Sequence, residues 1–417
     1  APRCFSLKLA KVTKELCGMS QCTIDNELCF LHRECRSSDG SANASAKTYQ
    51  LIAVLAKHVD DLKITGSKEN IIWILKKIEQ VFGQLKIEWN NFTNCGVRHR
   101  QDVNTKEVTM DQAEYINGVK TLSSSEMQRT GPETLCSTLL HHQYWSVLGA
   151  IAFATLTRPD ILVFVSALQR FSHAPKIIHC KRLNTVIRWA KRNPKCLRFA
   201  QLDTANRPAG TMIQTHLRMY ADAAFKKEDD SGHSMRGALY VRCIGKKIAD
   251  FQGTRKGHLV DYVGAKQRRV VRATFSAELL NACDTQDKGL LLSQQFHEMC
   301  TGQTHASCAR ELSERGGHAV PMVLYIDALS VFAAVTATFV KTPAENGVLC
   351  HLLFLRELLD HNVLHAFVWC DTRDMLADGL TKGAVDRAAI HAVMNGTCEL
   401  VKVCKVWRPA HLLRNQQ

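Results

Sequence analysis

Four acidic residues in the second half of the sequence stand where carboxylates can bind metal ions together. Asp222 and Asp327 each follow an apolar, strand-like run, whereas Glu278 and Asp378 lie in segments with helical patterning. Hydrolysis of a phosphodiester needs an activated water and a stabilised leaving oxygen, and two Mg²⁺ ions about 3.5–4 Å apart can supply both. Mg²⁺ prefers hard oxygen ligands, so Asp and Glu are the residue types required. We therefore predict a two-metal nuclease site with Mg²⁺, or alternatively Mn²⁺.

The segments around these residues predict a mixed α/β fold. Apolar runs indicate strands at 217–220, 238–241, 248–251, 323–326 and 364–369. Helical patterning indicates helices at 276–299, 328–338 and 346–361, and a short helix that contains Asp378. A polar loop is expected at 301–319. This order predicts a mixed sheet with helices on both faces, and it puts two carboxylates at strand ends and two on adjacent helices.

The first half of the sequence predicts a hairpin followed by helices. Apolar residues at 51–55 and 62–66 flank the turn His58-Val59-Asp60-Asp61, and the small polar residues 36–47 indicate a loop. Helices are expected from Asn70, a capping residue, to Phe82, and at 144–156, 160–172 and 177–192. The last of these helices carries five basic residues, Lys181, Arg182, Arg188, Lys191 and Arg192. Contact with nucleic acid and a merely solvated face are equally good interpretations of this charge.

Composition points to an intracellular protein with a polyanionic partner. The net charge is +15, and Lys and Arg attract phosphates whatever the base sequence. The 17 cysteines lack paired spacing and follow no secretory segment, which favours reduced thiols. The cluster of Cys17, Cys22, Cys29, His32 and Cys35 lacks the tight spacing of a zinc finger. No apolar run is long enough to cross a membrane. Cytoplasm, virus-like particle and nucleus remain open as locations.

The four carboxylates together indicate a metal site more specifically than any one of them does, because a single Asp after a strand is usually a cap or turn residue. Their motifs occur in the order Tyr220-Ala221-Asp222-Ala223, Ser276-Ala277-Glu278-Leu279, Tyr325-Ile326-Asp327-Ala328 and Leu376-Ala377-Asp378-Gly379-Leu380-Thr381-Lys382. This pattern resembles the ribonuclease H domain of copia-type LTR retrotransposon polyproteins, most specifically in the last motif. The resemblance implies that Asp222, Glu278 and Asp327 bind metal ions, and that Asp378 completes the second site. The substrate would be the RNA strand of an RNA–DNA hybrid.

The same resemblance extends upstream. His58-Val59-Asp60-Asp61 is similar to the Tyr-Val-Asp-Asp hairpin of the family's polymerase, and Thr157-Arg158-Pro159-Asp160-Ile161 is similar to the segment between palm and nuclease. Asp60 and Asp61 would then be two of three acidic ligands in a polymerase remnant. The third is expected upstream of Ala1, in a missing segment of the same polyprotein, so this chain alone should not polymerise DNA.

The resemblance predicts four regions: a partial palm and thumb at 1–125, a helical thumb or connection at 126–211, a ribonuclease H-like domain at 212–385 and a tail at 386–417. An integrase-type nuclease is disfavoured because its acidic residues resemble an Asp, Asp, Glu order. The long spacing between Asp222 and Glu278, and Lys341-Thr342-Pro343-Ala344-Glu345 in place of a His-containing stretch, depart from the family. The rival interpretation is a decayed or repurposed element that binds nucleic acid without cutting it.

Overall fold

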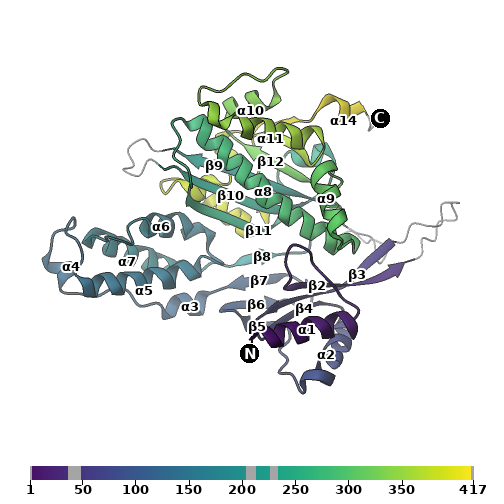
Figure 1. The fold of residues 1–417 in the computed structure, drawn as a ribbon. Coiled ribbons are helices and arrows are strands. Elements are labelled where there is room, and N and C mark those ends of the chain that lie inside the picture. The colour runs from purple at the N-terminus through teal and green to yellow at the C-terminus, as the bar shows by residue number, and fades with distance from the viewer. Residues whose placement is uncertain (1, 36–47, 203–212, 226–232, 415–417) are drawn as a thin grey trace.

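The structure of the chain is a computed structural model that describes residues 2–35, 48–202, 213–225 and 233–414 (Figure 1). It has three sheets with helices packed against them, and the predicted α/β class is confirmed. The loop expected at 36–47 lies outside the described residues.

The first sheet is antiparallel and is covered by two helices. Its strands, in order, are β1 (Ser20–Gln21), β2 (Leu28–Cys35), β3 (Thr48–His58) and β4 (Asp61–Gly66). The helices α1 (Pro2–Glu15) and α2 (Lys68–Phe82) share one apolar cluster with β2 and β3. The predicted hairpin is confirmed, since His58 pairs with Asp61 across a two-residue turn. The helix expected from Asn70 begins slightly earlier, because Ser67 caps it by accepting from the Asn70 amide.

A second sheet leads into a helical region. The strands are β5 (Asn91–Asn94), β6 (Val97–Gln101), β7 (Val108–Asp111) and β8 (Leu197–Phe199). The helices are α3 (Ala113–Gly118), α4 (Glu126–Arg129), α5 (Thr138–Ala154), α6 (Pro159–Gln169) and α7 (Ile177–Arg192). The three helices expected here are confirmed, although α5 starts six residues earlier than 144, after the cap at Ser137. Pro159 occupies the first turn of α6, where its missing amide proton costs no hydrogen bond.

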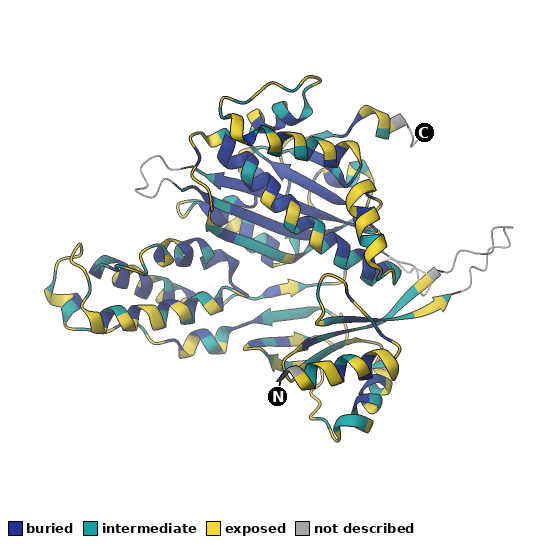
Figure 2. Cartoon of the chain, in the orientation of Figure 1, coloured by how far each residue is buried: buried dark blue, intermediate teal, exposed yellow. Residues whose placement is uncertain are grey.

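The third sheet has seven strands and the most deeply buried core. The strands are β9 (Thr215–Ala224), β10 (Met235–Ile244), β11 (Arg255–Lys266), β12 (Met322–Ile326), β13 (Leu364–Trp369), β14 (Thr397–Cys398) and β15 (Lys405–Trp407). They lie in the order β14-β11-β10-β9-β12-β13-β15. The β9–β12 and β12–β13 pairs are parallel, and the other pairs are antiparallel. Every residue of β12 is buried, as is usual for a parallel strand covered on both faces (Figure 2).

Alternation along β12 shows how both faces of this sheet are covered. Met322, Leu324 and Ile326 face the helices α8 (Thr274–Thr301), α10 (Leu329–Thr336) and α11 (Leu349–Asp360). Val323 and Tyr325 face the opposite layer, which contains η3 (Thr372–Asp374), α12 (Asp378–Thr381) and α13 (Ala388–Met394). The remaining elements are η1 (Ile248–Phe251), α9 (Ala306–Arg315), η2 (Asn346–Val348) and α14 (Ala410–Arg414).

Two sequence predictions in this region are wrong. The expected strand at 248–251 is the 3-10 turn η1, held by the Asp250 carboxylate, which accepts from the Lys246 and Lys247 amides. The returning strand is β11. The expected loop at 301–319 contains α9, whose single buried residue, Leu312, leaves little hydrophobic pattern to detect. Residues 386–417, for which the sequence predicts only a tail, add β14 and β15 to opposite edges of the sheet.

Candidate metal centre

Asp222 lies near the end of β9, where one glycine allows another element to come close. In the sheet, Asp222 on β9 is paired with Gly237 on the neighbouring strand β10. A Cβ atom on Gly237 would lie 2.7 Å from Thr381 Cγ2 and 3.1 Å from the Ala377 carbonyl oxygen. The absence of a side chain at this position therefore lets α12 pack directly over Asp222.

Asp327 reaches the same edge of the sheet because β9 and β12 are parallel neighbours. It directly follows β12, so its carboxylate emerges beside that of Asp222. Trp369 Nε1 donates to the Asp327 carbonyl oxygen at 2.9 Å and fixes the backbone there. Asp378, at the start of α12, supplies the third carboxylate. One oxygen from each of these three side chains lies within 4.8 Å of the others.

Glu278 stands next to this triad on α8. Its Oε2 accepts from the Ala223 amide at 3.1 Å, and the residue is 6% exposed. Asn281, on the next turn, donates to the carbonyl oxygens of Asp222 (2.7 Å) and Gly237 (3.0 Å). Asn281 thus ties α8 to both strands at the site. In the sequence, Asn281 could be recognised only by its position three residues after Glu278, which puts both residues on one face of the helix.

The electrostatics are those of carboxylates crowded in a poorly solvated place. Burial, and then the charges of Asp222 and Asp327, raise the pKa of Glu278 to about 9. Burial and Asp222 raise the pKa of Asp378 to about 6, and the same two causes raise the pKa of Asp327. Such a cluster gains stability from any cation that enters it.

Lys382 bridges two of these carboxylates, although the sequence predictions give it no role. Its Nζ lies 2.6 Å from Asp378 Oδ1 and 3.2 Å from Asp222 Oδ1, while Thr381 Oγ1 donates to Asp222 Oδ2. Burial tends to lower the pKa of Lys382, but the two carboxylates outweigh it and raise the pKa. The signal for this contact is the four-residue spacing from Asp378 to Lys382.

The donor set fits a hard divalent cation. Asp222, Asp327 and Asp378 offer only oxygen atoms, which Mg²⁺ and Mn²⁺ prefer over softer ligands. Glu278 lies beside these three residues, with its carboxyl group turned to the Ala223 amide. The structure therefore brings three of the four predicted carboxylates into one possible ligand group and puts the fourth beside it.

The predicted polymerase residues lie elsewhere, on the β3–β4 hairpin. Asp60 belongs to the turn, where Val59 has a φ of 52°, and Asp61 begins β4; both are exposed. Within the described ranges, neither belongs to a group of three potential metal ligands. Among those same residues, the cysteines and the histidine around Cys17, whose spacing already argues against a zinc finger, form no such group either. The 17 cysteines are present as thiols rather than as disulfides.

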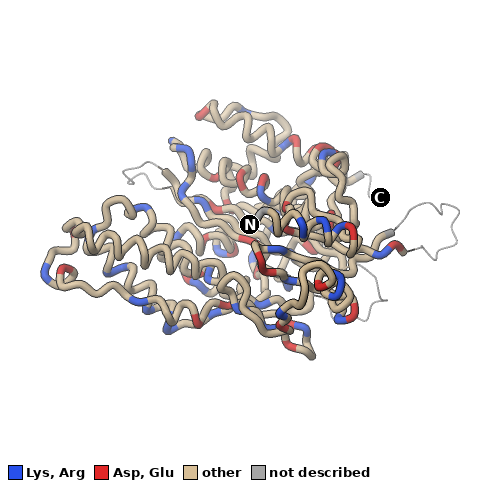
Figure 3. The backbone as a smooth tube through the Cα atoms, turned by 60° about the horizontal axis from the view of Figure 1, so that its bottom comes forward, with Lys and Arg blue, Asp and Glu red and all other residues tan. Residues whose placement is uncertain are grey.

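The basic residues of α7 lie on its outer side. Lys181, Arg182, Arg188 and Arg192 are exposed and Lys191 is half-buried. Leu183, Ile187 and Ala190 occupy the opposite, buried side. Lys and Arg occur in every part of the chain, so α7 is one of several basic regions (Figure 3).

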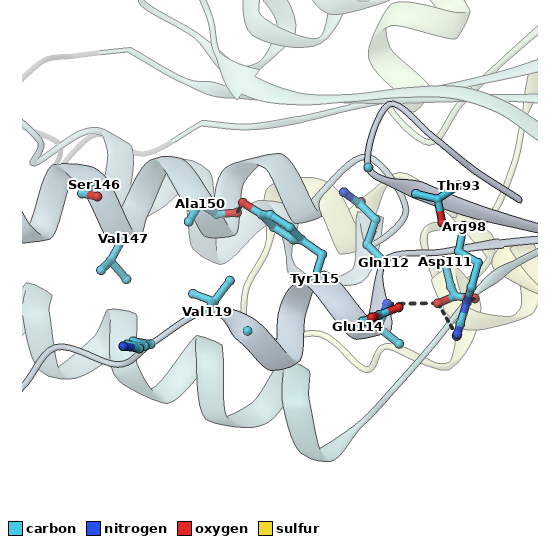
Figure 4. Close-up of a pocket in the computed structure, with 14 residues that line it drawn as sticks. Thr93, Arg98, Asp111, Gln112, Glu114, Tyr115, Val119, Ser146, Val147 and Ala150 are labelled. Atoms are coloured by element: carbon cyan, nitrogen blue, oxygen red, sulfur yellow. Dashed lines mark hydrogen bonds and ion pairs between the residues drawn. The ribbon is translucent and has the colours of Figure 1, made fainter. Parts of the chain in front are cut away.

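A cavity of about 770 Å³ lies between β5–β7, α3 and α5, and none of the predicted site residues lines it (Figure 4). Two of the charged residues that line it, Arg98 and Asp111, are hydrogen-bonded to each other at 3.0 and 3.3 Å, and Glu114 and Lys120 are the others. Tyr115 donates to the Ala150 carbonyl oxygen. No three potential metal ligands converge among the described residues of this lining, so the carboxylate cluster is the stronger candidate for chemistry.

Comparison with known proteins agrees with the sequence motifs. No family model matches the chain. It is 26% identical over 245 residues to the "Retrovirus-related Pol polyprotein from transposon RE1" and 25% identical over 245 residues to that from transposon RE2, both of Arabidopsis thaliana. Each match covers 58% of this chain and 14% of the relative.

No helix in the described ranges is both long and apolar enough to span a membrane. The resemblance to retrotransposon Pol polyproteins that the motifs indicate is confirmed: the chain is similar to two of them, over a part of their length.

Proposed function

We propose that the chain is a reverse transcriptase and ribonuclease H fragment of a retrotransposon polyprotein, and that its C-terminal domain hydrolyses the RNA strand of RNA–DNA hybrids. The observation that carries this proposal is the convergence of Asp222, Asp327 and Asp378, with one oxygen from each within 4.8 Å of the others. The similarity to Pol polyproteins supports it independently.

In this proposal each carboxylate has a distinct task. Asp222 would contribute to both ion positions, because its carboxylate lies close to those of Asp327 and Asp378, and each of these two would hold one ion. Glu278 joins when it leaves the Ala223 amide. Two bound Mg²⁺ ions would supply an activated water and a stabilised leaving oxygen. The protein recognises the RNA strand by its 2′-hydroxyl groups and its A-like helix.

The hairpin at Asp60 and Asp61 is proposed to be an incomplete polymerase site. Two exposed carboxylates on one turn leave a polymerase short of its third acidic ligand, and the described residues offer no such group there. Nucleic acid would instead be bound by the nuclease domain and by the basic face of α7, which is directed to solvent.

A cleavage assay tests the proposed activity. The RNA strand of a hybrid is end-labelled and incubated with the chain and Mg²⁺, and the rate is compared with that of Asp222→Asn and Asp327→Asn. We expect each substitution to slow cleavage at least about a hundredfold, because it removes a metal ligand. Asp284→Asn, at an exposed carboxylate on α8, is the matched control and should cleave normally.

Two outcomes would contradict the proposal. If the wild-type chain cuts no faster than Asp222→Asn while still binding the hybrid, the chain is a nucleic-acid-binding element without catalysis. If the same preparation extends a primer on an RNA template, the polymerase region is not incomplete.

A further inference from the structure

Lys382 contacts the carboxylates of two of the three candidate metal ligands, Asp222 and Asp378. Its ammonium group donates to Oδ1 of Asp222 and to Oδ1 of Asp378, at 3.2 and 2.6 Å. The other oxygen of Asp222 accepts from Thr381 Oγ1. Both oxygens of Asp222 therefore accept from consecutive residues of the chain, and one of these donors is a cation that would repel a metal ion at the same carboxylate.

The backbone around Lys382 is anchored, which fixes where its side chain starts. Arg387 donates through Nη2 to the Lys382 carbonyl oxygen at 3.0 Å and through Nη1 to the Gly379 carbonyl oxygen. The Arg387 guanidinium in turn lies 4.9 Å from the centre of the Phe164 ring on α6. The short helix α12 is thus held in place by Arg387, and Lys382 is directed into the carboxylate cluster.

The side chain itself is able to move away. It is 36% exposed, whereas the Asp222 side chain is 1% exposed. One end of the ion pair is therefore fixed in the core and the other can reach solvent. The bonded ammonium supplies one positive charge to a cluster of four acidic side chains, so it relieves their repulsion only in part.

We propose that Lys382 is a built-in counter-ion: it occupies the metal-binding oxygens of Asp222 and Asp378 in the metal-free protein, and divalent metal must displace it to bind. This inference rests on the proposed metal site. It gives Lys382 two opposing effects, since the residue stabilises the metal-free fold and weakens metal binding.

The test compares Lys382→Met with Lys382→Arg and with Lys256→Met, a control at an exposed lysine on β11. Thermal unfolding is measured in EDTA and in saturating Mg²⁺, and the Mg²⁺ dissociation constant is measured by calorimetry. For Lys382→Met we expect a lower melting temperature in EDTA, a larger rise on adding Mg²⁺, and a dissociation constant reduced at least about fivefold, the low end of typical coupling between two competing interactions. Lys382→Arg keeps the charge and should resemble the wild type.

Amine labelling gives a readout on the unmodified protein, should Lys382→Met fail to fold. With an acylating reagent and mass spectrometry, Lys382 should react faster in Mg²⁺ than in EDTA, while Lys256 should react equally in both. Equal or slower labelling of Lys382 in Mg²⁺ overturns the inference, as does an unchanged or weaker Mg²⁺ affinity in Lys382→Met.

These results separate the inference from the proposed activity. Mg²⁺ binding that displaces Lys382 in a chain that cuts no hybrid would leave the counter-ion role intact and defeat the nuclease. Hybrid cleavage by the wild-type chain, together with unchanged Mg²⁺ affinity in Lys382→Met, would support the nuclease and defeat the counter-ion role. A wild-type chain that binds no Mg²⁺ defeats both.

Discussion

At the scale of single residues, burial decides which charged groups need a partner. Glu278, with a pKa of about 9, carries its proton at neutral pH when no metal is bound.

Arg218, fully buried on β9, donates to the carbonyl oxygens of Asp250 and Gly253 and contacts the Cys398 sulfur at 3.8 Å. Its guanidinium also lies 5.5 Å from the centre of the Tyr325 ring.

His216 is held neutral by this arrangement. Arg218 Nε donates to His216 Nε2 at 3.2 Å, so the ring proton lies on Nδ1, which donates to the Gly245 carbonyl oxygen at 2.8 Å. Burial and then the charge of Arg218 lower the pKa of His216 to about 3, from an ordinary value of 6.5.

This shift predicts a pH dependence of stability in EDTA. Because the folded pKa lies below the unfolded one, the unfolded chain binds more protons between pH 6.5 and about 3, and the free energy of unfolding falls as pH falls through that window. In His216→Gln this contribution is absent, so the slope should be shallower by up to roughly 1.4 kcal/mol per pH unit. Urea unfolding at several pH values measures it.

His173→Gln, at an exposed histidine, serves as the control and should keep the wild-type slope. Equal slopes for His216→Gln and the wild type would mean that His216 is not neutral in the folded protein.

The sequence identifies the acidic residues but not their partners. Asp222, Asp327 and Asp378 are found from their motifs because strand ends and helix starts leave a local pattern. The partners of these carboxylates are residues that contact segments remote in the chain. Gly237 leaves space for α12, Asn281 donates to the Asp222 carbonyl oxygen, and Lys382 contacts the Asp222 carboxylate. The only local signals are the helical spacings of Asn281 from Glu278 and of Lys382 from Asp378, and Gly237 has none because its role depends on packing alone.

At the scale of elements, α7 presents its charge in a regular stripe. Lys181, Arg188 and Arg192 recur at spacings of seven and four residues, which puts them on one exposed side of the helix. The helix is anchored by the buried residue Asn184, which exchanges hydrogen bonds with the backbone of Leu122 at 2.8 Å. The stripe is therefore rigidly displayed.

If this stripe contacts nucleic acid, reversing two of its charges weakens hybrid binding. For Lys181→Glu with Arg188→Glu we expect the slope of log affinity against log salt to become shallower by about 2, one for each phosphate that the helix no longer neutralises. Lys14→Glu, on the outer face of α1, is the control. Fluorescence anisotropy with a labelled hybrid measures both; an unchanged slope would show that the stripe is only solvated.

Element prediction succeeds where the hydrophobic pattern is strong and local. The helix expected at 177–192 has the observed bounds because its buried residues recur at helical spacing. The strand expected at 248–251 is wrong because Asp250 uses its carboxylate to form a tight turn, which competes with strand pairing. The turn buries only Phe251, which lies fully inside the core, while Ala249 is exposed.

At the scale of the whole molecule, the regions are joined by buried polar contacts. Arg158 and Asp160 form a fully buried ion pair at 2.8 Å at the start of α6. Arg158 also donates to the Ala190 carbonyl oxygen on α7, and Asp160 contacts His391 on α13 at 3.3 Å. The motif Thr157–Ile161 thus connects the helical region to the seven-stranded sheet and its covering helices (Figure 1).

A second junction joins the first sheet to α8. Thr23 donates through its amide to Glu298 at 2.8 Å, and His32 contacts the Met299 carbonyl oxygen at 2.9 Å. Neither junction can be predicted from the sequence, because residues remote in the chain meet only after each region has folded. The same reason explains why β14 and β15 leave no usable signal: two- and three-residue strands are defined by the edges they pair with.

Anomalous diffraction from crystals grown with Mn²⁺ would locate metal in the folded chain. We predict two Mn²⁺ peaks about 3.5–4 Å apart. They should be coordinated by Asp222, Asp327 and Asp378, with Glu278 turned from the Ala223 amide toward them and Lys382 withdrawn. Mn²⁺ bound elsewhere on the chain, with Lys382 still bridging Asp222 and Asp378, would contradict the proposal that these carboxylates form a metal-dependent nuclease site.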